Sequence, residues 1–314
     1  MRLIMLGTGP FAVPTLRALA ADRSHEVALV VTRPPRGRNA DASPMQQAAE
    51  SLGISVWSPD TLNSTESQAR LASLKPELLV VCDYGEILKP GVLTTARLGG
   101  INLHGSLLPK YRGAAPVQWA ILRGETETGN TVFQITPGVD AGPCLGQQRT
   151  PIDPDEDAGQ LEARLAEMGA ELVCRVVADL AAGTARPVEQ DRGQASKAPR
   201  LKKEDGVIDW TQPPQAIKDQ VRALRPWPRA VTFWHRGQGG PLRLNIDRVA
   251  IVEAPVRGEA APGTVLDAKG RLVVATGDGA VEVAELQPAG KRAMSAEEFL
   301  RGNRVGIGDI FGPR

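Results

Sequence analysis

Residues 101–116 read Ile-Asn-Leu-His-Gly-Ser-Leu-Leu-Pro-Lys-Tyr-Arg-Gly-Ala-Ala-Pro and join the end of a short apolar strand to a loop rich in glycine and proline. Residues two apart in a strand point to the same face, so Asn102 and His104 are expected to project side by side. Open α/β sheets bind ligands at such strand ends. An amide donor beside an imidazole suits a carbonyl oxygen that becomes an oxyanion. The stretch therefore predicts a polar site at a strand end, against the plainer interpretation of a strand that merely ends in polar residues.

The first half of the chain alternates apolar runs typical of strands with segments of helical periodicity, as parallel α/β domains do. The run Leu-Leu-Val-Val-Cys at 78–82 is apolar at every position, which indicates burial on both faces. Strands are predicted at residues 3–6, 26–31, 78–82, 100–104 and 130–135, and helices at residues 14–21, 44–52, 115–123 and 161–180. We therefore predict an α/β domain with a doubly wound, mostly parallel sheet.

The second half of the chain follows a different pattern. From Val188 to Gly206 the periodicity stops and polar residues dominate, which indicates a linker. Short strands separated by glycine-containing turns are then predicted at residues 231–234, 242–246, 263–266, 272–275 and 281–286. Closely spaced short strands favour a small β-barrel. The predicted organisation is a first domain at residues 1–188, a linker at 189–206 and a second domain at 207–314.

The composition is that of an ordinary globular protein, with 42% hydrophobic and 23% charged residues in a chain of 314, a length that favours two domains. Neither a membrane span nor a signal peptide is expected from the apolar runs. Three widely spaced cysteines suit a reducing cytoplasm and predict neither a disulfide frame nor a metal site. Residues 200–314 hold 18 Lys and Arg against 14 Asp and Glu, which permits a nucleic-acid partner.

The stretch Gly7-Thr8-Gly9-Pro10-Phe11-Ala12 follows a predicted strand and fits the pattern of a dinucleotide-binding turn. Pro10 removes an amide that such a turn offers to a pyrophosphate, and the second predicted strand ends without an acidic residue for a ribose hydroxyl. The glycines therefore favour a simple tight turn. An NADP site that uses Arg33 stays open as an alternative.

Three motifs together resemble a known family. They are Asn102-x-His104-x-Ser106-Leu107-Leu108-Pro109, the following Tyr111-Arg112-Gly113-Ala114-Ala115-Pro116, and Gly138-Val139-Asp140-Ala141-Gly142. In this combination they resemble the formyltetrahydrofolate-dependent formyltransferases, and the similarity extends over nearly the whole chain. The later stretch Leu286-Gln287-Pro288-Ala289-Gly290-Lys291-Arg292-Ala293-Met294 resembles the members of that family that act on transfer RNA.

The resemblance implies a Rossmann-like first domain and an OB-like second domain that binds transfer RNA. It also implies a reaction, in which a formyl group moves from 10-formyltetrahydrofolate, a co-substrate, to the α-amine of initiator methionyl-tRNA. The product would supply translation initiation in the cytoplasm. No metal, no membrane and no obligatory protein partner are expected.

The family's catalytic residues correspond to Asn102, His104 and Asp140. Taken alone, Asp140 reads as an ordinary turn aspartate, and its convergence with the other two is what the resemblance implies. Asn102 and a cationic His104 would donate to the formyl oxygen as it gains charge, while Asp140 would hold His104 and accept the proton of the amine.

Two segments correspond to the family's folate-binding residues. The loop formed by Ser106, Leu107, Leu108 and Pro109 would lie along the co-substrate. The backbone of a second segment, formed by Tyr84, Gly85, Glu86, Ile87 and Leu88, would meet the pterin ring. Ordinary core packing is the alternative interpretation for the apolar side chains of both segments.

Contacts to transfer RNA are expected from Arg36 and Arg38, in a basic loop, and from Lys202 and Lys203, in the linker. The basic loop is shorter than is usual in the family, and Asn39-Ala40-Asp41 stands where further lysines are usual. Three rival interpretations remain: a formyltransferase for a small amine, an NADP-dependent oxidoreductase, and a non-catalytic RNA-binding protein.

Overall fold

The structure is a computed structural model that describes residues 1–35, 41–236, 240–253 and 260–313. These residues form two compact units. The first comprises Met1–Pro116, Glu127–Pro151 and Gln160–Pro199, and the second comprises Val117–Thr126, Ile152–Gly159 and Arg200–Arg314. Two short segments from the first half of the chain therefore pack with the carboxyl-terminal residues. No helix among the described residues is long and apolar enough to cross a membrane.

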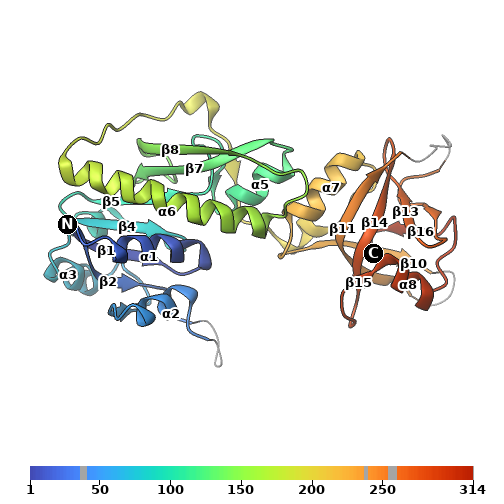
Figure 1. The fold of residues 1–314 in the computed structure, drawn as a ribbon, viewed down its shortest axis with the longest axis horizontal. Coiled ribbons are helices and arrows are strands. Elements are labelled where there is room, and N and C mark those ends of the chain that lie inside the picture. Colours follow the sequence, from blue (N-terminus) through green and yellow to red (C-terminus); the bar gives the residue numbers. More distant parts are fainter. Residues whose placement is uncertain (36–40, 237–239, 254–259, 314) are drawn as a thin grey trace. The chain divides into compact units, whose positions relative to one another are not determined.

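A seven-stranded sheet organises the first unit, with the strand order β3-β2-β1-β4-β5-β7-β8 (Figure 1). Its strands are β1 (Arg2–Gly7), β2 (Glu26–Val31), β3 (Val56–Trp57), β4 (Leu78–Cys82), β5 (Gly100–His104), β7 (Glu127–Gln134) and β8 (Cys144–Pro151). The pairings from β3 to β5 are parallel, and β7 and β8 add antiparallel strands at one side. The predicted doubly wound, mostly parallel sheet is confirmed.

Helices cover both faces of this sheet, as the alternation along the strands requires. On one face, Ile4 and Leu6 of β1 pack in a buried cluster with Leu71 of α3 and Val92 of α4. On the other face, Leu103 of β5 lies against Gly169 of α6. The helices are α1 (Val13–Ala21), α2 (Pro44–Ser51), α3 (Thr65–Ser73), α4 (Pro90–Leu93) and α6 (Ala158–Ala182). Every residue of β4 is buried, as its apolar sequence predicts.

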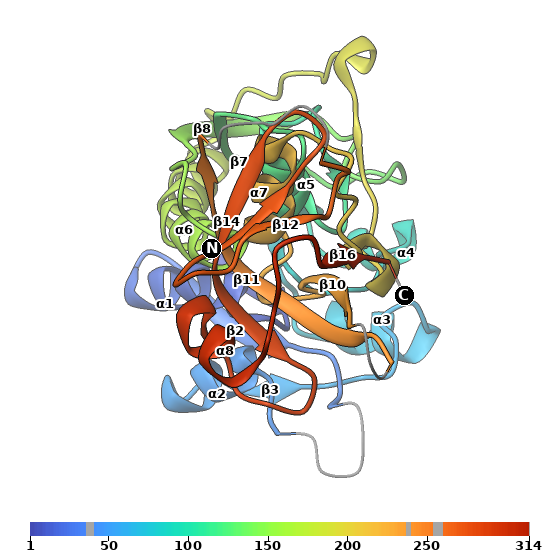
Figure 2. The same ribbon diagram turned by 90° about the vertical axis from the view of Figure 1, so that its right-hand side faces the viewer.

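The second unit is an antiparallel, nearly closed barrel with the strand order β12-β13-β14-β11-β10-β16 (Figure 2). Its strands are β10 (Ala230–His235), β11 (Leu242–Val252), β12 (Val265–Asp267), β13 (Leu272–Ala275), β14 (Ala280–Pro288), β15 (Met294–Ser295), which pairs with β14, and β16 (Ile310–Gly312). The α-helices of this unit are α5 (Pro116–Leu122), α7 (Pro214–Ala223) and α8 (Ala296–Gly302). The predicted barrel class is confirmed.

The two end strands of the barrel order meet through backbone hydrogen bonds. Val265 N donates to Asp309 O at 2.8 Å, and Phe311 N donates to Gly263 O at 2.8 Å. Gly263 has a φ of +88°, and a Cβ placed on it would lie 2.1 Å from Phe311 O. Only glycine therefore lets the two strand ends approach this closely.

We expect Gly263→Ala to lower the thermal unfolding midpoint more than Gly270→Ala does. Both glycines have a φ of +88°, so a side chain strains the backbone at both positions. No atom lies within 4 Å of a Cβ on Gly270, whereas the one on Gly263 collides with backbone. Thermal denaturation followed by circular dichroism measures the difference. Equal losses in the two variants would show that the contact with Phe311 does not limit barrel closure.

Candidate active site

The candidate site lies where β5 ends beside β4 in the first unit. His104, the last residue of β5, is 6% exposed, and its ring meets the ring of Phe133 edge to face at 6.5 Å. Asn102 lies two residues earlier on the same strand and is half-buried. No hydrogen bond engages the Asn102 amide within the described part of the chain, so it is available to an incoming oxygen. The strand therefore presents these two groups side by side, as the sequence predicts.

The two nitrogens of His104 face different partners. Nε2 lies 2.9 Å from Tyr111 O, and because a carbonyl oxygen only accepts, this contact assigns a proton to Nε2. Nδ1 then faces Asp140, whose Oδ2 lies 3.8 Å away. This separation exceeds an ordinary hydrogen bond. The Nδ1 side of the ring is thus the side open to proton exchange.

The loop that carries Asp140 begins at the end of β5 that lies away from His104. Because β7 runs antiparallel to β5, its last residue Gln134 pairs with Ile101, at the far end of β5 from His104. The loop at 135–143 turns back, and the Asp140 Oδ2 accepts a hydrogen bond of 2.8 Å from Gly113 N. Asp140 has a φ of +46° and is 18% exposed at its side chain. The structure therefore brings Asn102, His104 and Asp140 into one region of the first unit.

The loop at 106–109 is held by hydrogen bonds to Lys110 and to Thr131 of β7. Ser106 is fully buried, and its hydroxyl donates to Lys110 O at 2.7 Å. Thr131 Oγ1 donates to Ser106 O at 2.7 Å and accepts from Leu108 N at 3.0 Å. Leu108 is buried and Leu107 is half-buried, while the Leu108–Pro109 peptide is cis. The Ser106 hydroxyl thus shapes the loop; a contact of the loop with folate stays a prediction.

Among the side chains of the segment at 84–88, that of Ile87 is the exposed one. Tyr84 and Leu88 are buried, whereas Ile87 is 72% exposed. The Glu86 carboxylate accepts hydrogen bonds from Leu62 N and Asn63 Nδ2. Arg33 pairs with the same carboxylate at 3.0 Å. Glu86 therefore anchors this segment to a neighbouring loop, and the exposed apolar group that remains for a ligand is Ile87.

The glycine turn after β1 is covered by a carboxylate that the sequence interpretation did not single out. A Cβ on Gly9 would lie 1.9 Å from Asp83 Oδ2, and the Gly9 backbone hydrogen-bonds the carboxylate. Asp83 is exposed as a residue, but its carboxyl group is packed inward, and burial raises its pKa to about 6. Burial and the charge of Asp83 also raise the pKa of Glu162 in α6. Two carboxylates near this turn make it a poor site for a pyrophosphate, which disfavours the NADP alternative.

The predicted contacts to transfer RNA lie in different parts of the chain. Arg36 and Arg38 fall outside the described residues. Lys202 and Lys203 belong to the second unit, where both are exposed at the start of a short 3₁₀ helix, Lys203–Gly206. Among the described residues, no cluster of three or more His, Cys, Asp or Glu side chains is arranged to hold a metal ion.

Comparison with known proteins shows that the fold is that of the formyl-transferring enzymes. Residues 1–177 match the formyl transferase family, and residues 200–304 match the carboxyl-terminal domain of formyl transferases. The chain is 47% identical over 310 residues to the methionyl-tRNA formyltransferase of Solibacter usitatus, covering 97% of this chain and 96% of that protein. It is 42% identical to that of Roseiflexus castenholzii, covering 99% of each. The chain belongs to the methionyl-tRNA formyltransferase family.

Solved structures of more distant proteins share the fold. A sugar 3N-formyltransferase, WlaRD, superposes with a TM-score of 0.68 at 16% identity, covering 93% of this chain and 99% of that one. An N-formyltransferase from Helicobacter canadensis, solved with folinic acid and dTDP-3-aminofucose, gives a TM-score of 0.67 at 18% identity, covering 90% and 97%. At these identities the likeness concerns the fold alone.

We expect Asp83→Asn to stabilise the protein at pH 7–8 and to have a much smaller effect near pH 4. The raised pKa means that the folded state binds the proton more tightly than the unfolded chain does. At low pH Asp83 is protonated and does not lower the free energy of unfolding. As the pH rises from about 4 to about 6 its carboxyl group ionises in a buried position, and the free energy of unfolding falls. Asparagine removes the buried charge. Unfolding midpoints measured across this range test the expectation, and a pH-independent difference between the proteins would contradict it.

Proposed function

We propose that this chain transfers the formyl group of 10-formyltetrahydrofolate to the α-amine of initiator methionyl-tRNA. The observation that carries the proposal is the grouping of Asn102, His104 and Asp140 at the end of β5. The family to which the chain belongs supports both substrates. Translation initiation consumes the product, so we place the reaction in the cytoplasm, and the chemistry requires no protein partner.

The reaction balances without a covalent enzyme intermediate. The neutral α-amine attacks the formyl carbon, and the carbonyl electrons move onto the formyl oxygen. When the oxyanion collapses, the bond between the formyl carbon and N10 of the folate breaks, and N10 takes a proton as it leaves. The amine loses one proton in the same sequence. The protein must therefore stabilise an oxyanion, remove one proton and deliver another.

The side chains at the site account for the first two of these functions. The free Asn102 amide donates to the developing oxyanion, and a protonated Nδ1 of His104 is the second donor, since Nε2 is committed to Tyr111 O. Asp140 accepts the amine proton, directly or through water, and lies 3.8 Å from His104 Nδ1. Each oxyanion donor of this kind is worth about 3–4 kcal/mol of transition-state stabilisation.

Two exposed apolar side chains mark the region that we assign to folate. Ile87 is 72% exposed on the segment after β4, and Val139 is 56% exposed on the loop that carries Asp140. We assign the pterin to the backbone of residues 84–88 and the rest of the co-substrate to the loop at 106–109.

A small amine is the rival acceptor, because sugar formyltransferases share the fold. The sequence identity separates the two cases: it is 16–18% with those proteins and 42–47% with methionyl-tRNA formyltransferases. A formylation assay should give product with charged initiator transfer RNA and much less with charged elongator methionyl-tRNA. Turnover of a nucleotide-linked amino sugar, with no product from either transfer RNA, would establish the rival function.

We expect Asn102→Ala and His104→Ala each to lower kcat by roughly 10²–10³-fold, because each removes one donor to the oxyanion. Asp140→Asn should abolish most activity, because an amide does not accept the proton of the amine. The measurements are kcat, the dissociation constant for a tetrahydrofolate analogue, which should change far less, and the pH–rate profile. His235→Ala, on the barrel, is the control. Near-normal kcat in either alanine variant would remove the oxyanion role, and an unchanged profile in Asp140→Asn would leave Asp140 as a turn residue.

Transfer-RNA binding should weaken with salt, because Lys202 and Lys203 are proposed to neutralise backbone phosphates. The variant Lys202→Gln with Lys203→Gln should flatten the slope of log affinity against log salt by up to about 1.8. Filter binding at several salt concentrations measures this slope. The variant Lys75→Gln with Lys269→Gln removes the same charge from exposed positions elsewhere. Equal slopes for wild type and the Lys202, Lys203 variant would move the phosphate contacts to other residues.

A further inference from the structure

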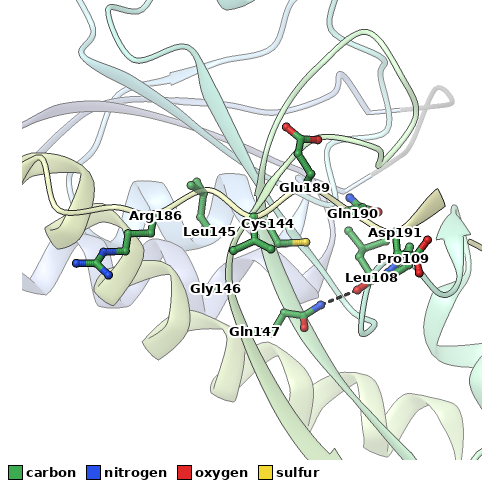
Figure 3. A pocket seen from close by; sticks show the side chains of 11 residues that line it. Leu108, Pro109, Cys144, Leu145, Gly146, Gln147, Arg186, Glu189, Gln190 and Asp191 are labelled. Atoms are coloured by element: carbon green, nitrogen blue, oxygen red, sulfur yellow. Dashed lines mark hydrogen bonds between the residues drawn. The ribbon is translucent and has the colours of Figure 1, made fainter. Parts of the chain in front are cut away.

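The segment at 186–199, called the strap below, returns along the first unit after α6 and is yellow in Figure 1. Nearly all of its residues are exposed, and only Gln190 and Ala198 are buried. A cavity of about 300 Å³ lies between the strap and β8, lined by Leu145, Gly146 and Arg186 among others (Figure 3). Apolar packing therefore contributes little to holding the strap, and its hydrogen bonds must hold it.

Those hydrogen bonds converge on the candidate active site. Cys144 and Val188 form an antiparallel bridge, and Lys197–Ala198 (β9) pairs with Arg112–Gly113 (β6). Arg112 N donates to Ser196 O at 2.8 Å. A Cβ on Gly113 would lie 2.3 Å from Ala198 O, so glycine is required for this approach. The strap thus fixes the backbone that supplies the Gly113 amide to Asp140.

The Gln190 side chain connects the loop that carries Asp140 to Arg112, on the loop that follows β5. Its Nε2 donates to Asp140 O at 2.9 Å and to Gly142 O at 2.7 Å. Its Oε1 accepts from Arg112 Nε at 3.1 Å and from the neighbouring guanidinium nitrogen at 2.7 Å. Gly113, the next residue, donates to the Asp140 carboxylate. A closed ring of contacts therefore runs from Asp140 through Gln190, Arg112 and Gly113 back to Asp140.

We propose that Gln190 is a positioning residue for formyl transfer, which holds the Asp140 backbone so that its carboxylate stays at a fixed distance from His104. Asp140 has left-handed backbone angles, with a φ of +46°, a conformation that is uncommon for a residue other than glycine and is favoured here by its surroundings. The two bonds from Gln190 lie on either side of Ala141 and enforce it. A shift of 1 Å in such a group can lower a rate about 100-fold.

This inference rests on the proposed function, and its test has one readout independent of it. Gln190→Met keeps the length of the side chain and removes both donors and the acceptor. Gln190→Glu keeps the acceptor for Arg112 and removes the donors to Asp140 and Gly142. Gln194 lies on the same strap, is exposed, and its side chain donates to the nearby Asp191, so Gln194→Met is the matched control.

We expect both Gln190 variants to lower kcat by about 10–100-fold, with KM for either substrate changed less than about threefold. Hydrogen exchange of the peptide spanning 136–144 should become faster in both, and Gln194→Met should match wild type in rate and exchange. Circular dichroism and the unfolding midpoint establish that the variants are folded.

The outcomes separate the possible roles. Faster exchange at 136–144 with kcat within threefold of wild type would overturn the positioning role and leave Gln190 as a purely structural residue. Unchanged exchange would also overturn the proposal. Full activity in Gln190→Glu alone would show that support of Arg112, and not the bonds to the Asp140 loop, is what matters. If the wild-type protein formylates neither transfer RNA, the proposed function fails, while the exchange result still decides whether Gln190 holds the loop.

Discussion

The hydrogen bond of 2.8 Å from Gly113 N to the Asp140 carboxylate is the contact on which the site depends. It joins a loop that follows β5 to a loop that follows β7, and it is much shorter than the 3.8 Å between the Asp140 carboxylate and His104 Nδ1. A hydrogen bond to a charged acceptor contributes about 1.5–3 kcal/mol, enough to offset the left-handed backbone of Asp140. The same loop supplies Tyr111 O to His104 Nε2. One loop therefore orients both the imidazole and its carboxylate.

The change of strand direction within the sheet explains why this loop is needed. β5 has a parallel neighbour, β4, on one side and an antiparallel neighbour, β7, on the other. Loops that follow parallel strands meet at one edge of the sheet, and β4 and β5 deliver their loops there directly. β7 runs the other way and ends where Gln134 pairs with Ile101, away from His104. The loop after β7 must therefore turn back along the strands to bring Asp140 to His104. An ordered return of this kind requires partners from elsewhere in the chain.

Much of the fold could be predicted from the sequence, because the signals are local. The strands at 26–31, 78–82, 100–104 and 272–275 were predicted with the bounds that the structure shows, since each is a compact apolar run. β8 was not predicted, because its exposed Gln147 and Arg149 hide the strand pattern. At the site, the adjacency of Asn102 and His104 follows from strand geometry alone, whereas the roles of these residues and of Asp140 stay predictions. The contacts of Gln190 join residues 48 to 78 positions apart, and no local pattern announces them.

The strap shows how an irregular polar segment can serve a site as well as connect domains. A stretch without hydrophobic periodicity cannot bury much apolar surface, so it stays on the outside of the domain. Its backbone can nevertheless pair with another irregular segment, as Lys197–Ala198 does with Arg112–Gly113. Each loop then satisfies polar groups of the other that would otherwise face a crowded site without partners. The left-handed residues Tyr111 and Asp140 both lie beside this pairing. Backbone conformations that are unfavourable in isolation are thus held by a segment distant in sequence, and the geometry around His104 follows from that support.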